Sequence, residues 1–274
     1  MAEFKFKRFT LNQRIQHIIF FASFILLAYT GFPLKFPDEW WSRWMIASVG
    51  GFDNRTFIHH YAGLAMLGVS VYHVVFHAIL EKPRVDVLFN LKDVQDFKQQ
   101  MLYYLRYSDE HPKFGRYTWK QKFEYFGAGF GAVVMGFTGI LMWHPLEAMK
   151  YLPIGLIQIS NLIHTWEAVL ASLAVFIGHF YDEHFGKFLN ISWITGNISE
   201  EEMRHEHPLE YEDAMKSHGI EDAGSVNEHG KERNNFLVIG FAKILFAIVF
   251  IAITVWMLWI SYHALVEAVT TYML

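Results

Sequence analysis

Long apolar runs alternate with polar stretches along the chain. Five of them reach the length of about 20 residues that a helix needs to cross a bilayer. They occupy residues 15–34, 56–80, 125–146, 151–181 and 236–266. The first three contain no Asp, Glu, Lys or Arg; the fourth contains only Glu167 and the fifth only Lys243. Because open sheets cannot cross lipid, the pattern predicts an all-α integral membrane protein with five transmembrane helices.

The polar stretches divide the chain into three parts. Residues 1–190 hold the first four spans, which are expected to form a four-helix bundle, and residues 236–274 hold an additional C-terminal helix. Between them, residues 191–235 form an acidic loop, expected to be partly helical or disordered. Four histidines of this loop are expected to lie in solvent: His205, His207, His218 and His229. No internal repeat is evident by inspection.

The basic residues predict the orientation of the spans. Lys and Arg gather before the first span and between the second and third, whereas the other two short loops carry few. The positive-inside rule then places the N-terminus in the cytoplasm and the C-terminus outside. No small-residue cleavage site follows the basic N-terminus, so the first apolar run is expected to be a retained span.

Composition supports a membrane protein and excludes several cofactors. Hydrophobic residues make up 53% of the chain and charged residues 18%, against about 25% charged residues in soluble domains. The absence of cysteine excludes iron–sulfur ligation by this chain, thiolate zinc sites and covalent c-type haem. A net charge of −4 indicates no nucleic-acid partner.

Histidines inside the spans are the main candidate chemistry, because ionisable residues in a membrane are costly and usually functional. His59 and His73 are 14 residues apart, which on a helix is a net rotation of about −40° and a rise of about 21 Å. His164 and His179 are 15 residues apart, a rotation of about 60° and a rise of about 22 Å. Each of the two helices thus offers one imidazole near each membrane face, as two stacked haems held by imidazoles require.

A b-type haem with two histidine ligands needs no cysteine, and neutral imidazole binds haem iron well. The expected iron ligands are His17, His59, His164 and His179. His73 and His184 are kept as alternative ligands or as ligands of a third haem. Glu167 lies one turn from His164, where it would orient that ligand or relay a proton; a carboxyl kept neutral by burial is the other interpretation.

Four stretches of this sequence resemble a known family. They are RIQHIIFFASFILLAYTGFPLKFP, FIHHYAGLAML, RYTWKQKFEY followed later by TGILMWHP, and LIHTWEAVLASLAVFIGHFY. Together they resemble the membrane cytochrome b (gamma) subunits of respiratory formate dehydrogenases and the related cytochrome b subunits of hydrogenases and thiosulfate-type reductases. The resemblance runs from about residue 9 to 181.

The resemblance implies how the ligands pair. The outer haem would use His59 and His164, and the inner haem His17 and His179. A quinone, menaquinone or ubiquinone, would bind beside the inner haem, and the side chains offered there are Tyr117, Thr118 and Gln121. This sequence departs from the family in two ways. The gap between His164 and His179 is one residue longer than expected, which indicates a bulge or a rotated ligand. His73 is an additional histidine.

The function implied is electron transfer across a prokaryotic cytoplasmic membrane, through two b haems or three. The chain would be the quinone-reacting subunit of a respiratory oxidoreductase and not the subunit that oxidises the primary substrate. Expected partners are an iron–sulfur or multihaem c-type protein on the outer face, an oxidoreductase subunit, lipid and quinone. Two other classes stay open: a non-haem membrane metal transporter, and a structural anchor for a peripheral enzyme.

Overall fold

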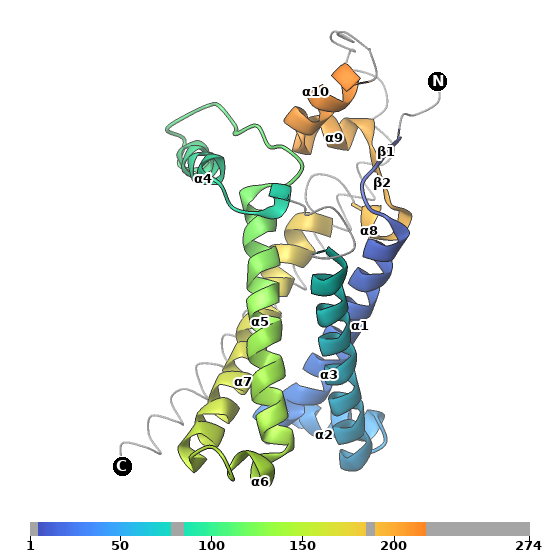
Figure 1. The fold of residues 1–274 in the computed structure, drawn as a ribbon, viewed down its shortest axis with the longest axis vertical. Helices are drawn as coiled ribbons and strands as arrows, with labels where there is room; N and C mark the ends of the chain where they lie inside the picture. Colours follow the sequence, from blue (N-terminus) through green and yellow to red (C-terminus); the bar gives the residue numbers. More distant parts are fainter. Residues whose placement is uncertain (1–4, 78–84, 185–189, 218–274) are drawn as a thin grey trace.

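Four long helices lie side by side in the computed structural model, which describes residues 5–77, 85–184 and 190–217 (Figure 1). They are α1 (Leu11–Lys35), α3 (Phe52–Val75), α5 (Trp119–Trp143) and α7 (Ile154–Ala174). Helix α1 packs mainly against α3, and α5 against α7; α3 also contacts α5, and α1 contacts α7. The expectation of a helical protein is confirmed for the part of the chain that the structure describes.

Three helices in the described part are long and apolar enough to cross a membrane. They cover Leu11–Lys35, Trp119–Trp143 and Ile154–Glu183. Their large apolar side chains, such as Phe123, Phe130 and Val133, point away from the protein, as a lipid-facing surface requires. Helix α3 has 24 residues, about 36 Å of helix, and is less apolar because it carries several polar side chains. The span predicted at 236–266 lies outside the described residues.

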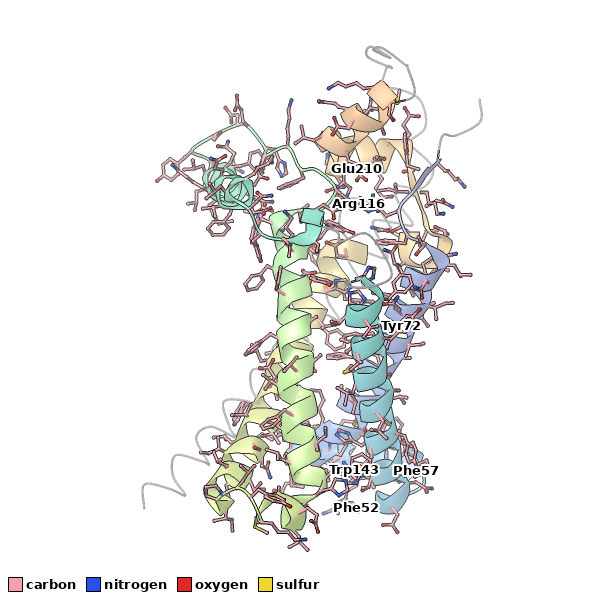
Figure 2. The ribbon with its side chains drawn as sticks, in the orientation of Figure 1. Phe52, Phe57, Tyr72, Arg116, Trp143 and Glu210 are labelled. Atoms are coloured by element: carbon pink, nitrogen blue, oxygen red, sulfur yellow. The ribbon has the colours of Figure 1, made fainter. Side chains whose placement is uncertain are left out.

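Short elements cover the two ends of the long helices. Helices α2 (Trp40–Ser48) and α6 (Pro145–Ala148) lie at one end, called here the outer end after the predicted orientation. The opposite, inner end carries the N-terminal strand β1 (Lys5–Lys7), the short helix η2 (Val85–Val87), α4 (Leu91–Tyr104), α8 (Ser192–Thr195), β2 (Asn197–Ser199), α9 (Glu200–Glu206) and α10 (Pro208–Ser217). Figure 2 shows Phe52, Phe57 and Trp143 at the outer end and Arg116 and Glu210 at the inner end.

A small antiparallel sheet departs from the predicted all-α class. Strand β1 pairs with β2, with Phe6 opposite Ile198. The turn before β2 is made by Gly196, whose φ of +81° suits glycine. A Cβ on Gly196 would lie 2.8 Å from the Phe9 carbonyl oxygen, so only glycine permits this approach. The sheet ties the start of the chain to the segment after the fourth long helix, a contact that local sequence patterns do not encode.

The structure reveals an internal repeat that inspection of the sequence missed. Helices α1 and α5 begin with the same capping box, in which Thr10 pairs with Gln13 and Thr118 with Gln121. The same spacing recurs along both segments, with Arg8, Thr10, Gln13, Thr30, Gly31 and Pro37 matched 108 residues later by Arg116, Thr118, Gln121, Thr138, Gly139 and Pro145. The α1–α3 and α5–α7 hairpins are thus two copies of one unit. The few identical positions are widely spaced, which hides the repeat.

A π-helix absorbs the extra residue between His164 and His179. Helix α7 continues as η3 (Val175–His184), which has π-helical hydrogen bonding. One π turn accommodates an additional residue without breaking the helix, and such turns often occur at functional sites. The bulge expected from the longer gap is therefore confirmed, and it turns His179 toward the neighbouring helices.

Candidate functional site

Two histidines face each other at the outer end. The ring centroids of His59 in α3 and His164 in α7 are 6.5 Å apart, with an interplanar angle of 63°. Each Nδ1 lies 2.9 Å from a threonine Oγ1, that of Thr30 for His59 and that of Thr138 for His164. Each hydroxyl also donates to the carbonyl four residues earlier in its own helix. It therefore accepts from Nδ1–H, which leaves the Nε2 lone pair of both rings for a ligand.

Glycines let these two imidazoles approach the neighbouring helices. A Cβ on Gly31 would lie 3.2 Å from Cε1 of His59, and a Cβ on Gly139 would lie 3.2 Å from Cε1 of His164. The Thr-Gly pair of each repeat thus performs two tasks, because the threonine fixes the tautomer of the ring and the glycine provides space for it. Both halves of the outer site are built in the same way.

A second pair of histidines faces each other at the inner end. The ring centroids of His17 in α1 and His179 in η3 are 5.9 Å apart, with an interplanar angle of 49°. Here Nδ1 of His179 lies 3.0 Å from Oε2 of Glu124 in α5, a carboxylate and not a hydroxyl. The ring of Trp193 lies 5.7 Å from that of His17. The structure thus brings together the same pairs of histidines that the family resemblance implies.

The geometry of both pairs fits a metal held between two imidazoles. A metal about 2 Å from each ligating nitrogen places two opposed imidazole centroids about 6 Å apart, close to the 5.9 and 6.5 Å observed. Two neutral imidazoles are a ligand set of b-type haem. Within residues 5–77, 85–184 and 190–217 there is no group of three or more His, Asp or Glu side chains suited to a metal ion.

Two arginines support the same interpretation. Among the described residues, the Nε atoms of Arg14 and Arg55 are buried and have no hydrogen-bond partner. Arg55 lies at the outer end, where its Nη1 donates to the Thr30 carbonyl oxygen over 2.9 Å. Arg14 lies at the inner end, where its Nη1 donates to the Ile194 carbonyl oxygen. Each site thus has an arginine whose Nε–H is available to an acidic group, such as a propionate of haem.

The structure places the alternative ligands elsewhere. Nδ1 of His73 lies 2.7 Å from Oε1 of Gln16, and its Nε2 lies 2.9 Å from the hydroxyl of Tyr125. Both ring nitrogens therefore contact polar side chains, and the geometry does not direct His73 toward the inner pair. The backbone of His184 ends η3, and its side chain lies outside the described residues. Oε1 of Glu167 would be 3.3 Å from a Cβ on Gly131, so this glycine makes room for the carboxyl.

The three side chains expected to bind quinone lie at the start of α5. Thr118 and Gln121 form the capping box of that helix. Gln121 also donates through Nε2 to Glu183 over 2.9 Å. The ring of Tyr117 lies 5.4 Å from the Arg8 guanidinium carbon. These residues lie at the inner end as expected, but the polar groups of Thr118 and Gln121 already contribute to helix capping.

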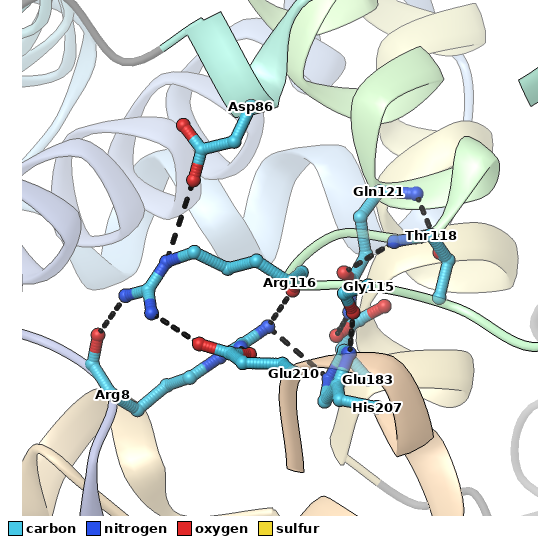
Figure 3. A network of polar contacts seen from close by, with 9 residues as sticks. All are labelled: Arg8, Asp86, Gly115, Arg116, Thr118, Gln121, Glu183, His207 and Glu210. Carbon is cyan, nitrogen blue, oxygen red and sulfur yellow. Dashed lines mark hydrogen bonds and ion pairs between the residues drawn. The ribbon is translucent and has the colours of Figure 1, made fainter. Parts of the chain in front are cut away.

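Sequence reasoning missed a charged cluster at the inner end, drawn in Figure 3. The carboxylate of Glu210 in α10 accepts from Nη1 of Arg8 over 2.7 Å and from Nη1 of Arg116 over 2.6 Å. Each arginine also donates through Nη2 to the backbone carbonyl of the other. This reciprocal arrangement, called here the arginine clamp, joins the starts of α1 and α5. The equal spacing of the two arginines within the repeat was the signal that could have found it.

One histidine of the acidic loop is buried, which corrects the expectation that it lies in solvent. His207 is only 4% exposed. Its Nδ1–H donates to the Gly115 carbonyl oxygen over 2.8 Å, and its Nε2 accepts from Nη2 of Arg8 over 3.1 Å. Burial and the neighbouring Arg8 lower the pKa of His207 to about 3. Described residues of the loop thus pack on the arginine clamp. This packing depends on tertiary contacts, which the local polarity of the loop did not indicate.

We expect acid to loosen this packing through His207. Its folded pKa of about 3 lies below the unfolded value of about 6.5, so its stabilising effect is present above pH 6.5 and is lost as the pH falls toward 3. At pH 5 the loss amounts to about 2 kcal/mol. Burial raises the pKa of Glu202 in α9 to about 7, so acid has the opposite effect through Glu202 in both proteins. His207 should therefore appear in hydrogen exchange of α9 and α10 at pH 7 and pH 5 as a difference between the two proteins, with the wild type losing more protection than His207→Gln. An equal loss in both proteins would contradict the prediction.

We also expect Thr138→Val to weaken the outer site. The substitution removes the acceptor for Nδ1–H of His164 while it keeps the shape of the side chain. Removal of a hydrogen-bond partner of a ligating histidine typically costs 10–100-fold in affinity. A haem held by His59 and His164 should therefore be the first to be extracted in competition with an apo-haem acceptor. Thr165→Val is the matched control, because Thr165 is half-buried on α7 and its hydroxyl donates within its own helix, to the Leu162 carbonyl oxygen.

The family model described as "Prokaryotic cytochrome b561" matches residues 8–196 of the chain. The matched region contains both histidine pairs and all four long helices.

Curated proteins with similar sequences carry related names. The chain is 23% identical over 213 residues to "Formate dehydrogenase, cytochrome b556(fdo) subunit" of Escherichia coli (strain K12), which covers 77% of this chain and 93% of that protein. It is 24% identical over 199 residues to the nitrate-inducible cytochrome b556(Fdn) subunit of the same strain, covering 71% and 84%. A formate dehydrogenase cytochrome b556 subunit of Haemophilus influenzae is 24% identical over 233 residues, covering 84% and 92%.

Proposed function

The chain belongs to the prokaryotic cytochrome b561 family, and from this premise we propose that it transfers electrons across the membrane between two b-type haems. One haem would be held by His59 and His164, and the other by His17 and His179. The observation that carries the proposal is the pairing of the four histidines from three different helices at two levels of the bundle. Bound haem supplies reversible one-electron exchange at iron.

The chain's own residues perform the positioning. Thr30 and Thr138 hold the outer imidazoles in the tautomer that presents Nε2, and Glu124 does the same for His179. The apolar outer surfaces of the helices keep both pairs within the bilayer. Ligand pairs at two levels of one bundle form a path along the membrane normal, with the outer pair near α2 and α6 and the inner pair near α4 and α8.

We propose that the inner end exchanges electrons with quinone and the outer end with a redox partner. The similar proteins are named as subunits of formate dehydrogenase, which supports a role as the membrane subunit of such an oxidoreductase. The partner that delivers or receives electrons would be an iron–sulfur or multihaem protein, as the family resemblance implies. The N-terminus and the acidic loop would then face the cytoplasm, in accord with the positive-inside rule.

A metal transporter or a purely structural anchor is supported less well. Neither role requires two opposed imidazole pairs with matched spacing and with Nδ1 of three of the four rings hydrogen-bonded to an acceptor.

The test is a pyridine haemochrome assay with protein quantitation on the purified full-length chain, followed by reduction with a quinol. We expect two b haems per chain and reduction of haem by menaquinol or ubiquinol in liposomes. Absence of haem would overturn the proposal, and haem that no quinol reduces would overturn its quinone part. A third haem would return His73 and His184 to the ligand set.

A further inference from the structure

The two sites differ in the group that accepts the Nδ1–H of the ligating histidines. At the outer site both acceptors are neutral hydroxyls, those of Thr30 and Thr138. At the inner site the acceptor for His179 is the carboxylate of Glu124. We propose that Glu124 is a positioning residue that holds the inner haem at a lower reduction potential than a neutral acceptor would; this inference rests on the proposed haem function.

The contact between Glu124 and His179 is built into the helix packing. Gly178 directly precedes His179 in η3, and a Cβ there would lie 3.2 Å from Oε1 of Glu124. The carboxylate therefore occupies space that any other residue at position 178 would fill. The Glu124 side chain is 23% exposed, so protein covers most of it. The π-helical turn and this glycine together bring the ligating histidine against the acid.

The neighbouring polar groups are bonded to other partners. Gln121, one turn before Glu124 in α5, donates to Glu183 over 2.9 Å. Lys120 pairs with Asp182 over 2.7 Å. Lys120 and Gln121 thus bond the carboxylates of residues 182 and 183, whereas the Glu124 carboxylate bonds the imidazole of His179.

The effect of such a contact on the metal follows from its chemistry. A hydrogen bond to a carboxylate is charge-assisted and roughly twice as strong as one to a neutral acceptor. It draws the Nδ1 proton away from the ring, which makes Nε2 a more basic ligand. A more basic ligand stabilises the ferric over the ferrous state, so the reduction potential falls. The outer site, with hydroxyl acceptors on both ligands, lacks this effect.

The repeat supplies a neutral counterpart of the same contact. Gln16 in α1 occupies the position that Glu124 has in α5, 108 residues later, and its Oε1 lies 2.7 Å from Nδ1 of His73. Gln16 bonds the histidine of α3 as Glu124 bonds that of η3. An amide at position 124 therefore fits the geometry, which makes Glu124→Gln a change of charge at constant shape.

The test is a spectroelectrochemical titration of the purified holoprotein at fixed pH, with haem content measured alongside. In Glu124→Gln we expect the ferrous-to-ferric ratio of the inner haem at a fixed potential to rise about tenfold, equivalent to about 59 mV for a one-electron couple. The outer haem should not change. The low-spin electron paramagnetic resonance signal of the inner haem should also shift, because that signal reports the strength of the axial ligand.

Two further variants make the outcome decisive. Glu206→Gln removes one carboxylate at the same end of the protein, whose side chain is 43% exposed and lies 2.9 Å from Nδ1 of His205, so it should leave both potentials unchanged. Glu124→Asp keeps the charge but withdraws it from His179, and we expect a smaller rise. An inner potential that is unchanged in both Glu124 variants with haem retained, or that moves equally in Glu206→Gln, would overturn the inference. Absence of haem from the wild type would instead overturn the proposed function.

Discussion

Under the proposed ligation, replacement of His179 by alanine should remove the inner haem and leave the outer one in place, which would halve the haem content. His179 faces His17 with ring centroids 5.9 Å apart, whereas the outer pair is formed by two other residues and is braced by its own threonines. Pyridine haemochrome analysis should therefore fall from two haems per chain to one. Redox difference spectra should lose one α-band component and keep the other.

His73→Ala is the matched control, because His73 also lies toward the inner end of its helix and also carries two polar contacts. We expect this variant to retain both haems. If it lost one haem while His17→Ala did not, the ligand opposite His179 would be His73, and the assignment of the inner pair would be wrong. His59→Ala should remove the outer haem alone and so distinguish the two spectra.

The long helices and the depths of the candidate histidines could be predicted because both depend on regular spacing. A membrane span requires a long apolar run, and a helix converts the separation of His59 from His73 into a depth and a direction. The gap before His179, which is one residue longer than the family resemblance leads us to expect, predicted a bulge or a rotated ligand, and the structure contains the π-helix η3 there. How the histidines pair across helices was not available from spacing and came from the family resemblance.

The partners of those ligands could not be predicted, because they are contacts between distant segments. Glu124 and His179 are 55 residues apart, and only the packing of α5 against η3 brings them together. His207 and Glu210 stood in a stretch whose polarity indicated a solvated loop, yet both contact arginines more than 90 residues away. Burial of such groups depends on tertiary partners that local composition does not reveal.

The repeat explains why the two sites differ. The histidines of the outer pair occupy equivalent positions in the two copies, so each has the same threonine and glycine beside it. The inner pair takes one histidine from α1 and one from η3, and the position equivalent to His17 is Tyr125, which contacts His73. Each copy thus supplies one histidine of the inner pair, but from non-equivalent positions, so the two inner ligands have different neighbours.

Glu210→Ala should destabilise the inner end more than other single substitutions in the acidic loop. Arg8 is 6% exposed and shares the carboxylate with Arg116, so the substitution leaves Arg8 without its anion, whereas Arg116 keeps Asp86 at 3.6 Å. Breaking a buried ion pair in this way costs about 3–5 kcal/mol. Amides of β1, β2 and α9 should then exchange on the order of 100-fold faster or more, with the haem content unchanged because no ligand is touched. Glu212→Ala, at an exposed position of the same helix, should leave exchange as in the wild type. If the two variants behaved alike, the arginine clamp would not be what holds the loop against the starts of α1 and α5.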